Sequence, residues 1–281
     1  FERCGLIVST GYDLKTARRS LNLLFADWAN RGLNRWTIEQ VSLPLVTGIA
    51  DYPAGILTMT VGTVNSFTEG ENITGATSGA TASITSVTSA TVFAITIPSG
   101  TFVAGETIAG ATSGASTTVT SAVDFSNVRS TIDILSAVIR QNNGTANQSD
   151  ISISRISRDT FINIPSKRTT ARPSQFYIDR QITPIVKLWG TPDALTYTLV
   201  FDRLVRIDDA DNPQNTVDVP FRFYPCLAAG LAYYISLKKA PNRVQLLKAV
   251  YEEEFERAAA EDRDRASLTL TPSRDYYSFI R

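Results

Sequence analysis

A fourteen-residue motif occurs twice in the chain, and this repeat constrains the fold more than any other feature of the sequence. Residues 67–80 read FTEGENITGATSGA and residues 102–115 read FVAGETIAGATSGA, an offset of 35 residues. A fixed period is the signature of duplicated supersecondary units. The Gly-Glu and Ser-Gly steps predict turns, and the alternating apolar residues around them predict short strands. We therefore expect a duplicated all-β module. The positions that mark its two copies are Phe67, Glu71, Phe102 and Glu106.

The charges of the chain are distributed unevenly around this repeat. The 27 Lys and Arg residues balance 27 Asp and Glu residues, yet residues 36–128 contain no Lys or Arg. Residues 57–125 hold four acidic residues and no basic one, a net charge of −4 against +4 for the remainder. Such a shift in composition predicts an insertion at residues 57–125 within a body formed by residues 1–56 and 126–281. The alternative is a flexible low-complexity linker, because Thr, Ser, Gly and Ala dominate residues 74–90.

The body is predicted to combine helices with antiparallel strands. Apolar residues at helical spacing predict helices over about 13–31, 219–239 and 242–266. Residues 129–206 read as a β region whose strands end at prolines. The predicted fold class is therefore α+β: a helical bundle packed with an antiparallel β domain, plus the inserted duplicated all-β module.

The last segment, residues 268–281, is predicted to be an extended tail. It is more apolar than an exposed tail should be, which indicates that it binds a partner. Its candidate binding residues are Leu268, Leu270, Pro272, Tyr276, Tyr277, Phe279 and Ile280.

The composition excludes several kinds of chemistry. The chain has no histidine and only two cysteines, which excludes Ser-His-Asp and Cys-His triads, histidine-containing zinc sites and four-cysteine sites. No nucleotide-binding or serine-hydrolase motif is found. The acidic residues 208–212 lack the spacing of a calcium loop and predict a solvated turn. We therefore expect no enzymatic activity, no cofactor and no bound metal.

Two carboxylate clusters are the remaining candidates for catalysis. Glu69 and Glu71 lie in a predicted turn of the repeat, and residues 252–254 lie on a charged helix face. A carboxylate pair can hydrolyse a glycosidic bond, so a peptidoglycan-cleaving enzyme is a disfavoured alternative. We expect both clusters to be solvated surface groups.

Basic side chains alternate with aromatic ones between residues 155 and 180. Such a cluster can contact the backbone of a nucleic acid, or it can pair with acidic residues of an adjacent subunit. The second reading is favoured, because a strong nucleic-acid binder normally carries a basic excess. The cluster consists of Arg155, Arg158, Lys167, Arg168, Arg172 and Arg180.

Nothing in the sequence predicts a membrane span or a signal peptide. The longest uncharged helical stretch, residues 223–237, is shorter than the roughly 20 residues that a span needs. Cys4 and Cys226 lie far apart, so a reducing compartment is the default expectation. The sequence starts at Phe1 rather than Met, so we expect an N-terminal piece to be missing from it.

Five stretches of the body together resemble the head-to-tail adaptor of short-tailed bacteriophages (podoviruses), the tail tubular protein A type. The resemblance covers residues 1–56 and 126–281 and leaves the insertion outside. The matching stretches are LLFADWANRG (23–32), ISRDTFINIPSK (156–167), RPSQFYIDRQ (172–181), PIVKLWGTP (184–192) and VPFRFYPCLAAGLAYY (219–234).

The resemblance implies a structural virion protein at the head-tail junction, assembled in the cytoplasm of the host bacterium. Such adaptors form a homo-oligomeric ring, commonly a dodecamer, between the portal protein and the tail nozzle protein. The C-terminal segment can reach the portal, and DNA passes through the lumen during packaging and ejection with transient, non-specific contact. In the alternative reading the protein is a tail-associated adhesion or fibre-docking protein, and its inserted repeats bind a host glycan or tail fibres.

Overall fold

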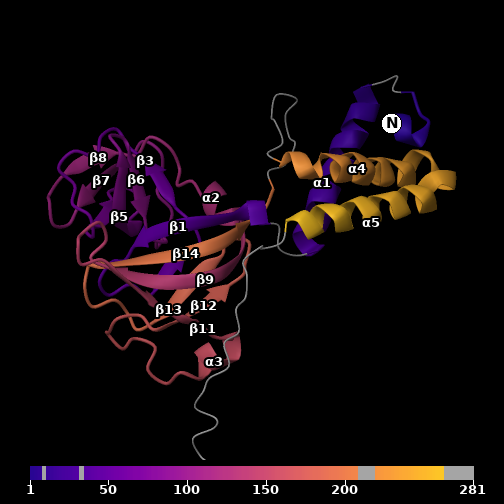
Figure 1. Cartoon of the computed structure of the whole chain (residues 1–281). Coiled ribbons are helices and arrows are strands. Elements are labelled where there is room, and N and C mark those ends of the chain that lie inside the picture. The colour runs from indigo at the N-terminus through magenta and orange to yellow at the C-terminus, as the bar shows by residue number, and fades with distance from the viewer. Residues whose placement is uncertain (8–10, 32–34, 208–218, 263–281) are drawn as a thin grey trace, which may run out of the picture. The chain divides into compact units, whose positions relative to one another are not determined.

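The computed structural model describes residues 1–7, 11–31, 35–207 and 219–262, and it contains both helices and antiparallel sheets (Figure 1). This confirms the predicted α+β class. The chain divides into two compact units. The helical unit consists of residues 1–36 and 209–281, and the β unit consists of residues 37–208.

Three long helices form the described part of the helical unit, with short 3₁₀ turns at their ends. The second helix starts later than residue 219, because Pro220 has an extended backbone and the chain then makes a 3₁₀ turn. Pro225 lies at the start of that helix, where its missing N–H costs no hydrogen bond. Residues 263–266 of the expected last helix lie outside the described residues. The long helices are α1 (Gly11–Arg31), α4 (Tyr224–Lys239) and α5 (Val244–Glu261), and the 3₁₀ turns are η1 (Glu2–Cys4), η2 (Arg35–Thr37), η3 (Phe221–Phe223) and η4 (Pro241–Arg243).

Helix α4 runs antiparallel to α5 and crosses α1 obliquely in the opposite general direction (Figure 1). The end of α4 reaches the start of α1, where Lys239 pairs with Asp13. The start of α4 reaches the end of α1, where the Phe223 and Trp28 rings lie 5.5 Å apart. Helix α5 turns back along α4 directly after η4 (Figure 1). Helices α1 and α5 therefore share the same general direction, although they cross obliquely (Figure 1).

The helices of this unit pack closely around Gly230 in α4. A Cβ atom at this position would lie 2.6 Å from Leu24 Cδ1 and 2.8 Å from Tyr251 Cε2, so only glycine allows α1 and α5 to approach α4 this closely. Leu24, Trp28 and Tyr251 are fully buried there. The indole N–H of Trp28 donates to the Tyr251 hydroxyl, which donates in turn to Asp27.

Two four-stranded sheets form the body of the β unit and share one hydrophobic core. In the first sheet all neighbours are antiparallel, with the order β1 (Ile38–Pro44), β14 (Tyr197–Val205), β9 (Thr131–Gln141) and β10 (Ser149–Ser152). In the second sheet the order is β11 (Ser154–Arg155), β12 (Gln175–Asp179), β13 (Ile185–Trp189) and β2 (Asp51–Pro53).

One pair of strands departs from the antiparallel prediction, because β11 and β12 are parallel. A parallel return needs a connection of about a dozen residues or more. Residues 156–174 supply that length and contain the short helix α3 (Arg158–Asn163).

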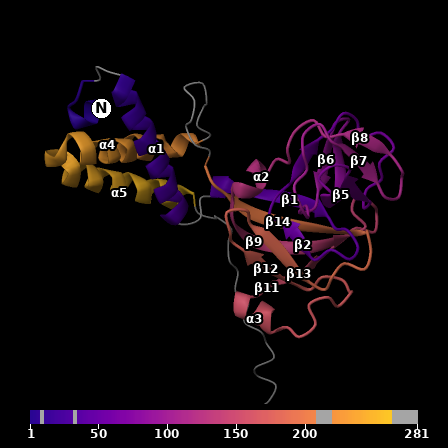
Figure 2. The same cartoon turned by 180° about the vertical axis from the view of Figure 1, so that it is seen from behind.

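Six further strands between residues 58 and 118 form a small barrel (Figure 1, Figure 2). The outer strands of this sheet meet where Val61 bridges Val119 and the Thr120 N–H donates to the Thr60 carbonyl at 2.8 Å. Its own apolar core includes Met59, Phe93 and Ile108. Helix α2 (Ser126–Arg129) follows it. The strand order is β3 (Thr58–Thr60), β6 (Val92–Ile95), β5 (Thr81–Ser89), β4 (Asn72–Gly75), β7 (Thr107–Gly110) and β8 (Ser116–Thr118).

The barrel consists of two interleaved three-stranded copies. Strands β3, β4 and β5 correspond to β6, β7 and β8, and the hydrogen bonds repeat in the same way: Ala76 donates to Thr107, and Ala111 donates to Asn72. Within a copy only one hairpin is paired, β4 with β5 or β7 with β8. All other contacts between strands join the two copies: β3–β6, β5–β6, β4–β7 and the contact of β8 with β3. Neither copy can therefore close the barrel alone.

Candidate functional site

A carboxylate from each copy of the repeat binds the turn of the other copy, and we call these two arrangements the carboxylate locks. Glu71 Oε2 accepts the N–H groups of Thr112 at 3.2 Å and Ser113 at 3.0 Å. The Ser113 hydroxyl donates to the same carboxylate, and Glu71 Oε1 also accepts the N–H of Thr68 at 2.6 Å in its own copy.

The second lock has the same bonds with the copies exchanged. Glu106 Oε2 accepts the N–H groups of Thr77 at 3.2 Å and Ser78 at 2.9 Å. Glu106 Oε1 accepts the Ser78 hydroxyl at 2.9 Å and the N–H of Val103 at 2.6 Å. The two locks thus tie each copy to the other through backbone groups about 30 to 40 residues away in sequence.

Glycine at two equivalent positions makes room for the locks. A Cβ atom on Gly75 would lie 2.7 Å from Glu106 Oε2, and a Cβ atom on Gly110 would lie 2.5 Å from Glu71 Oε2. The turns end at Gly79 and Gly114, both with φ of 66°, a left-handed conformation that glycine adopts without strain. The repeated GATSGA sequence is therefore explained by lock geometry.

The prediction that Glu71 is solvated is wrong, since its exposed fraction is 4%; that of its counterpart Glu106 is 5%. Burial raises the pKa of the Glu71 carboxyl, but the hydrogen bonds from Ser113 and two further N–H groups outweigh burial and hold the pKa below its ordinary value. Hydrogen bonds from the Ser78 and Val103 backbone likewise lower the pKa of Glu106. A buried carboxylate is stable when such donors replace water.

The remaining two acids of the insertion also accept backbone N–H groups. Glu69 accepts from Val87 at 3.2 Å, and Asp124 accepts from Ser126 at 2.8 Å. All four carboxylates of residues 57–125 thus accept hydrogen bonds from backbone N–H groups. This explains how the segment holds four negative charges without a single Lys or Arg.

The structure divides the predicted basic cluster into three groups. Arg155 donates to both carboxylate oxygens of Asp133 and to the Ile134 carbonyl, and Arg180 reaches the same Asp133 at 3.4 Å. Arg158 joins these two arginines around one hollow. Lys167 and Arg168 line another hollow, and Arg172 lies near Tyr197.

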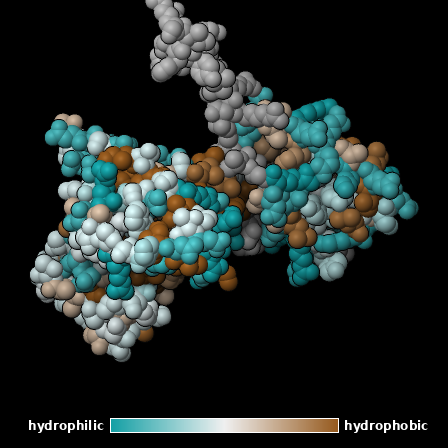
Figure 3. Space-filling view, turned by 90° about the horizontal axis from the view of Figure 1, so that it is seen from below, coloured by the Kyte–Doolittle hydropathy of each residue, from teal (hydrophilic) through white to brown (hydrophobic). Residues whose placement is uncertain are grey.

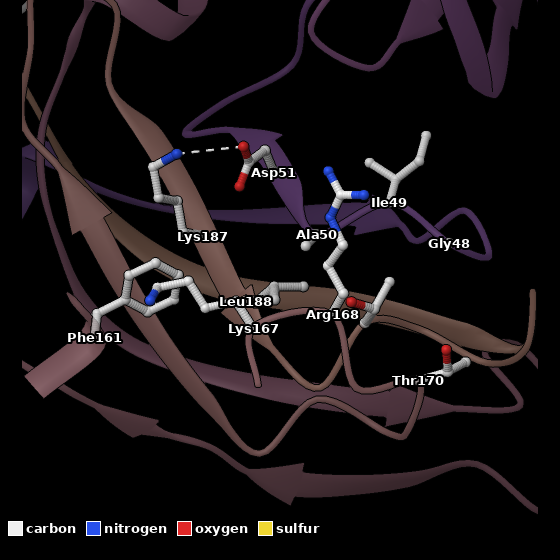
Figure 4. A pocket seen from close by; sticks show the side chains of 11 residues that line it. Gly48, Ile49, Ala50, Asp51, Phe161, Lys167, Arg168, Thr170, Lys187 and Leu188 are labelled. Atoms are coloured by element: carbon white, nitrogen blue, oxygen red, sulfur yellow. Dashed lines mark hydrogen bonds and ion pairs between the residues drawn. The ribbon is translucent and has the colours of Figure 1, made fainter. Parts of the chain in front are cut away.

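The hollow beside Lys167 has a volume of about 690 Å³ and an apolar floor under a basic rim. At the rim Lys187 pairs with Asp51 at 3.2 Å, while the Arg168 side chain extends toward Ile49 and Ala50 (Figure 4). Such a hollow suits a carboxylate or phosphate group of a partner. Its lining residues are Gly48, Ile49, Ala50, Asp51, Phe161, Lys167, Arg168, Thr170, Lys187, Leu188 and Thr191.

The rim cations of this hollow differ in how many of their hydrogen-bond donors have an acceptor within the chain. Lys167 Nζ donates to the carbonyls of Ile162 and Ile164 at the end of α3. Arg168 has no hydrogen bond or ion pair within the described residues, and the buried Thr191 hydroxyl also has no partner there. Arg168 is therefore the charged group of this hollow that is available to a partner.

Hydrophobic side chains are also exposed on both units, and the face in Figure 3 shows them as patches between hydrophilic residues. At the start of α4, Phe221 is 84% exposed and its ring lies 5.5 Å from that of Tyr224. The predicted binding residues of the tail, from Leu268 to Ile280, lie outside the described residues.

Both cysteines are buried and unlinked. The Cys4 thiol donates to the Ala232 carbonyl, and burial raises the pKa of Cys226 to about 12, which makes its thiol unreactive. Among the described helices none is long and apolar enough to cross a membrane.

Sequence comparison places these features in a family. A family model described as SU10 adaptor protein matches residues 80–274, which is more than two thirds of the chain. The matched range starts inside the barrel, just before β5, and includes α4 and α5. No curated protein matches the chain.

Proposed function

Because the chain belongs to the SU10 adaptor protein family of phage adaptors, we propose that it forms the ring that joins the portal to the tail nozzle. Family membership makes it a structural protein of a phage virion that contacts other phage structural proteins. The proposal adds the position in a short-tailed particle, the ring and the role as part of the DNA conduit.

The family match carries this proposal, because it extends over both the β unit and the helical unit. The proposed ring holds about twelve copies related by closed cyclic symmetry. Residues 268–281 are proposed to bind the portal protein. The opposite side of the ring is proposed to receive the nozzle protein and, through it, tail fibres.

A conduit protein should guide DNA without holding it, because every neutralised phosphate adds salt-dependent affinity. The balance of 27 basic and 27 acidic residues supports this role. The partners found for Arg155, Arg180 and Lys167 support it further, since these cations already donate to groups of their own chain. We propose no catalytic activity for the protein.

The test is a phage that lacks this gene product, complemented by plasmid-borne variants. The wild-type chain should restore particles with a ring below the portal, visible by electron microscopy. A chain ending at residue 267 should leave filled heads without tails. The matched control replaces only the tail's polar residues Thr269, Thr271, Ser273 and Ser278 with alanine, and it should restore tails. Complete particles without the chain, or with the chain elsewhere than the head-tail junction, would refute the proposal.

A further inference from the structure

Helix α1 carries an exposed stripe beside its buried side. Tyr12, Lys15, Arg19 and Leu23 recur at steps of three and four residues, so they lie on one face of the helix. All four are exposed, and the large apolar members, Tyr12 and Leu23, are 69% and 52% exposed. We call these four residues the α1 stripe.

Helix α5 carries a stripe of the same length but of opposite character. Ala249, Glu253, Glu256 and Ala260 are all exposed, and they also recur at steps of three and four residues. The buried residues of α5, among them Tyr251 and Ala258, lie on the other side of the helix. We call this second set the α5 stripe.

The charged side chains of the two stripes make almost no hydrogen bonds or ion pairs within the described part of the chain. Lys15, Arg19 and Glu256 make no hydrogen bond or ion pair within the described residues. Glu253 pairs with Arg257 one turn further along α5, an exposed contact of the kind that contributes little to stability. Two cations and two anions are therefore available to a partner of opposite charge.

The two stripes match when they are aligned in the same direction. Each spans twelve residues, and its first and last residues are about 16 Å apart along the helix. Tyr12 then faces Ala249 and Leu23 faces Ala260, so a large side chain meets a small one at each end. Between them the charges pair in order. The two pairs are Lys15 with Glu253 and Arg19 with Glu256.

The geometry of a ring favours this direction over the opposite one. Within one copy α1 and α5 point in the same general direction, because the end of α4 meets the start of α1 and α5 turns back along α4. Neighbours in a ring of about twelve copies differ by a rotation of about 30°, which changes the direction of a helix by about 30° at most. The α1 of one copy and the α5 of the next therefore keep the same general direction.

We propose that the α1 stripe of one copy packs against the α5 stripe of the next copy, and that this head-to-tail contact closes the ring. The inference rests on the proposed function, since it names the partner and the surface of that ring. The large-to-small apolar pairs supply the packing, and the charge pairs fix direction and register.

An antiparallel alignment would also pair each cation with an anion, but it would give a different assembly. It would place Tyr12 against Ala260 and Leu23 against Ala249. A contact of this kind relates two copies by a rotation of about 180° and produces a closed dimer. The residues at the ends of the stripes therefore distinguish a ring from a dimer.

Disulfide cross-linking in assembled particles tests the contact. The two natural cysteines are buried, so background cross-linking should be low. Tyr12→Cys combined with Ala249→Cys should give, after mild oxidation, a ladder of linked chains that rises stepwise toward the full ring. The matched control, Tyr12→Cys with Ala260→Cys, should stay at least tenfold less linked. Single variants give the background.

Charge exchange provides an independent measurement. Arg19→Glu alone and Glu256→Arg alone should each reduce the assembled fraction at least tenfold, while the double variant should recover to within about threefold of wild type. Unchanged thermal unfolding of the monomeric variants shows that folding is not the cause.

The outcomes separate the two proposals. Rings in wild-type particles without a link between positions 12 and 249 would overturn this contact and leave the adaptor function standing. Links between positions 12 and 260 with dimers would overturn the contact as well. Absence of any ring from the particles would overturn the proposed function itself.

Discussion

The charged side chains of the barrel have hydrogen-bond partners within the chain, whereas several of those in the helical unit have none among the described residues. The barrel region, residues 57–125, uses each of its four carboxylates to accept backbone N–H groups close by. The helical unit leaves Lys15, Arg19 and Glu256 without partners among the described residues. The barrel therefore satisfies its charged groups by itself, whereas the helical unit has exposed charges that fit another chain.

The largest expected effect comes from breaking a carboxylate lock. Glu71→Ala leaves three N–H groups and one hydroxyl without their acceptor, so the free energy of barrel unfolding should fall by about 3 kcal/mol or more. Hydrogen exchange of amides in residues 72–118 of the purified chain measures this loss. Glu69→Ala, which removes one exposed bond, is the control and should cost less than about 1 kcal/mol.

Because the two locks are equivalent, breaking the second lock should have the same effect as breaking the first. Glu106→Ala should accelerate exchange in the same strands as Glu71→Ala, because both join the two copies. If either variant exchanged like the wild type, the locks would not be what holds the barrel closed.

A smaller effect is expected from crowding the packing of the helical unit. Gly230→Ala should lower the free energy of unfolding by about 1 to 3 kcal/mol, because its Cβ would overlap Leu24 and Tyr251. Thermal unfolding followed by the fluorescence of the buried Trp28 reports this change. At Gly11 a Cβ would meet nothing within 4 Å, so Gly11→Ala should leave the midpoint unchanged. Equal shifts for both variants would contradict the packing argument.

Acid should weaken the barrel through the same two carboxyls. The pKa values of Glu71 and Glu106 are lowered in the folded state, so the unfolded chain binds more protons as the pH falls. Their contribution is present above the ordinary glutamate pKa and disappears as the pH drops through the folded values. Exchange protection of the barrel should be constant above about pH 5 and decline below it.

A double variant provides the comparison for this titration. Glu71→Gln with Glu106→Gln has no titrating group in the locks. Its barrel amides should be less protected from exchange than those of the wild type, and their protection should change less than that of the wild type between about pH 5 and pH 3. A wild-type profile as flat as that of the double variant would show that the lock carboxyls are not shifted on folding.

The smallest effect on stability is expected at the α1 stripe. Arg19→Ala removes an exposed side chain without a partner and should change the free energy of unfolding by less than about 0.5 kcal/mol. Chemical denaturation of the monomeric chain measures it. A loss above about 1 kcal/mol would mean that Arg19 serves the fold of its own unit, and the contrast with the barrel would then fail.

Periodicity and turn residues predicted much of the local structure. The strands at residues 175–179, 185–189 and 197–205 follow from alternating side chains between prolines, and α1 follows from apolar residues at helical spacing. The start of α4 was misplaced, because a proline can either begin a helix or precede it in an extended conformation.

The repeat was recognised from GATSGA, but its first strand was not. Residues 58–60 (TMT) and 93–95 (FAI) have no identical letter in common, yet both strands lie at the junction between the copies. Only their pairing reveals that they correspond. Likewise Glu71 appears solvated in a Gly-Glu turn, because the donors that bury it lie about 40 residues later in the chain. The division of the basic cluster also depends on long-range partners, as Asp133 shows for Arg155.

The bridge between Thr58 and Asp124 has a consequence for how this chain can be altered. The Asp124 N–H donates to the Thr58 carbonyl at 2.8 Å, and the Ile56 N–H donates to Asn127 Oδ1 at 2.8 Å, so the two crossings between barrel and body lie side by side. Antiparallel partners of this kind have Cα atoms about 5 Å apart, a gap that a short linker spans. The barrel can therefore be treated as an exchangeable cassette, and a reporter or binding domain with adjacent termini could be grafted into its place.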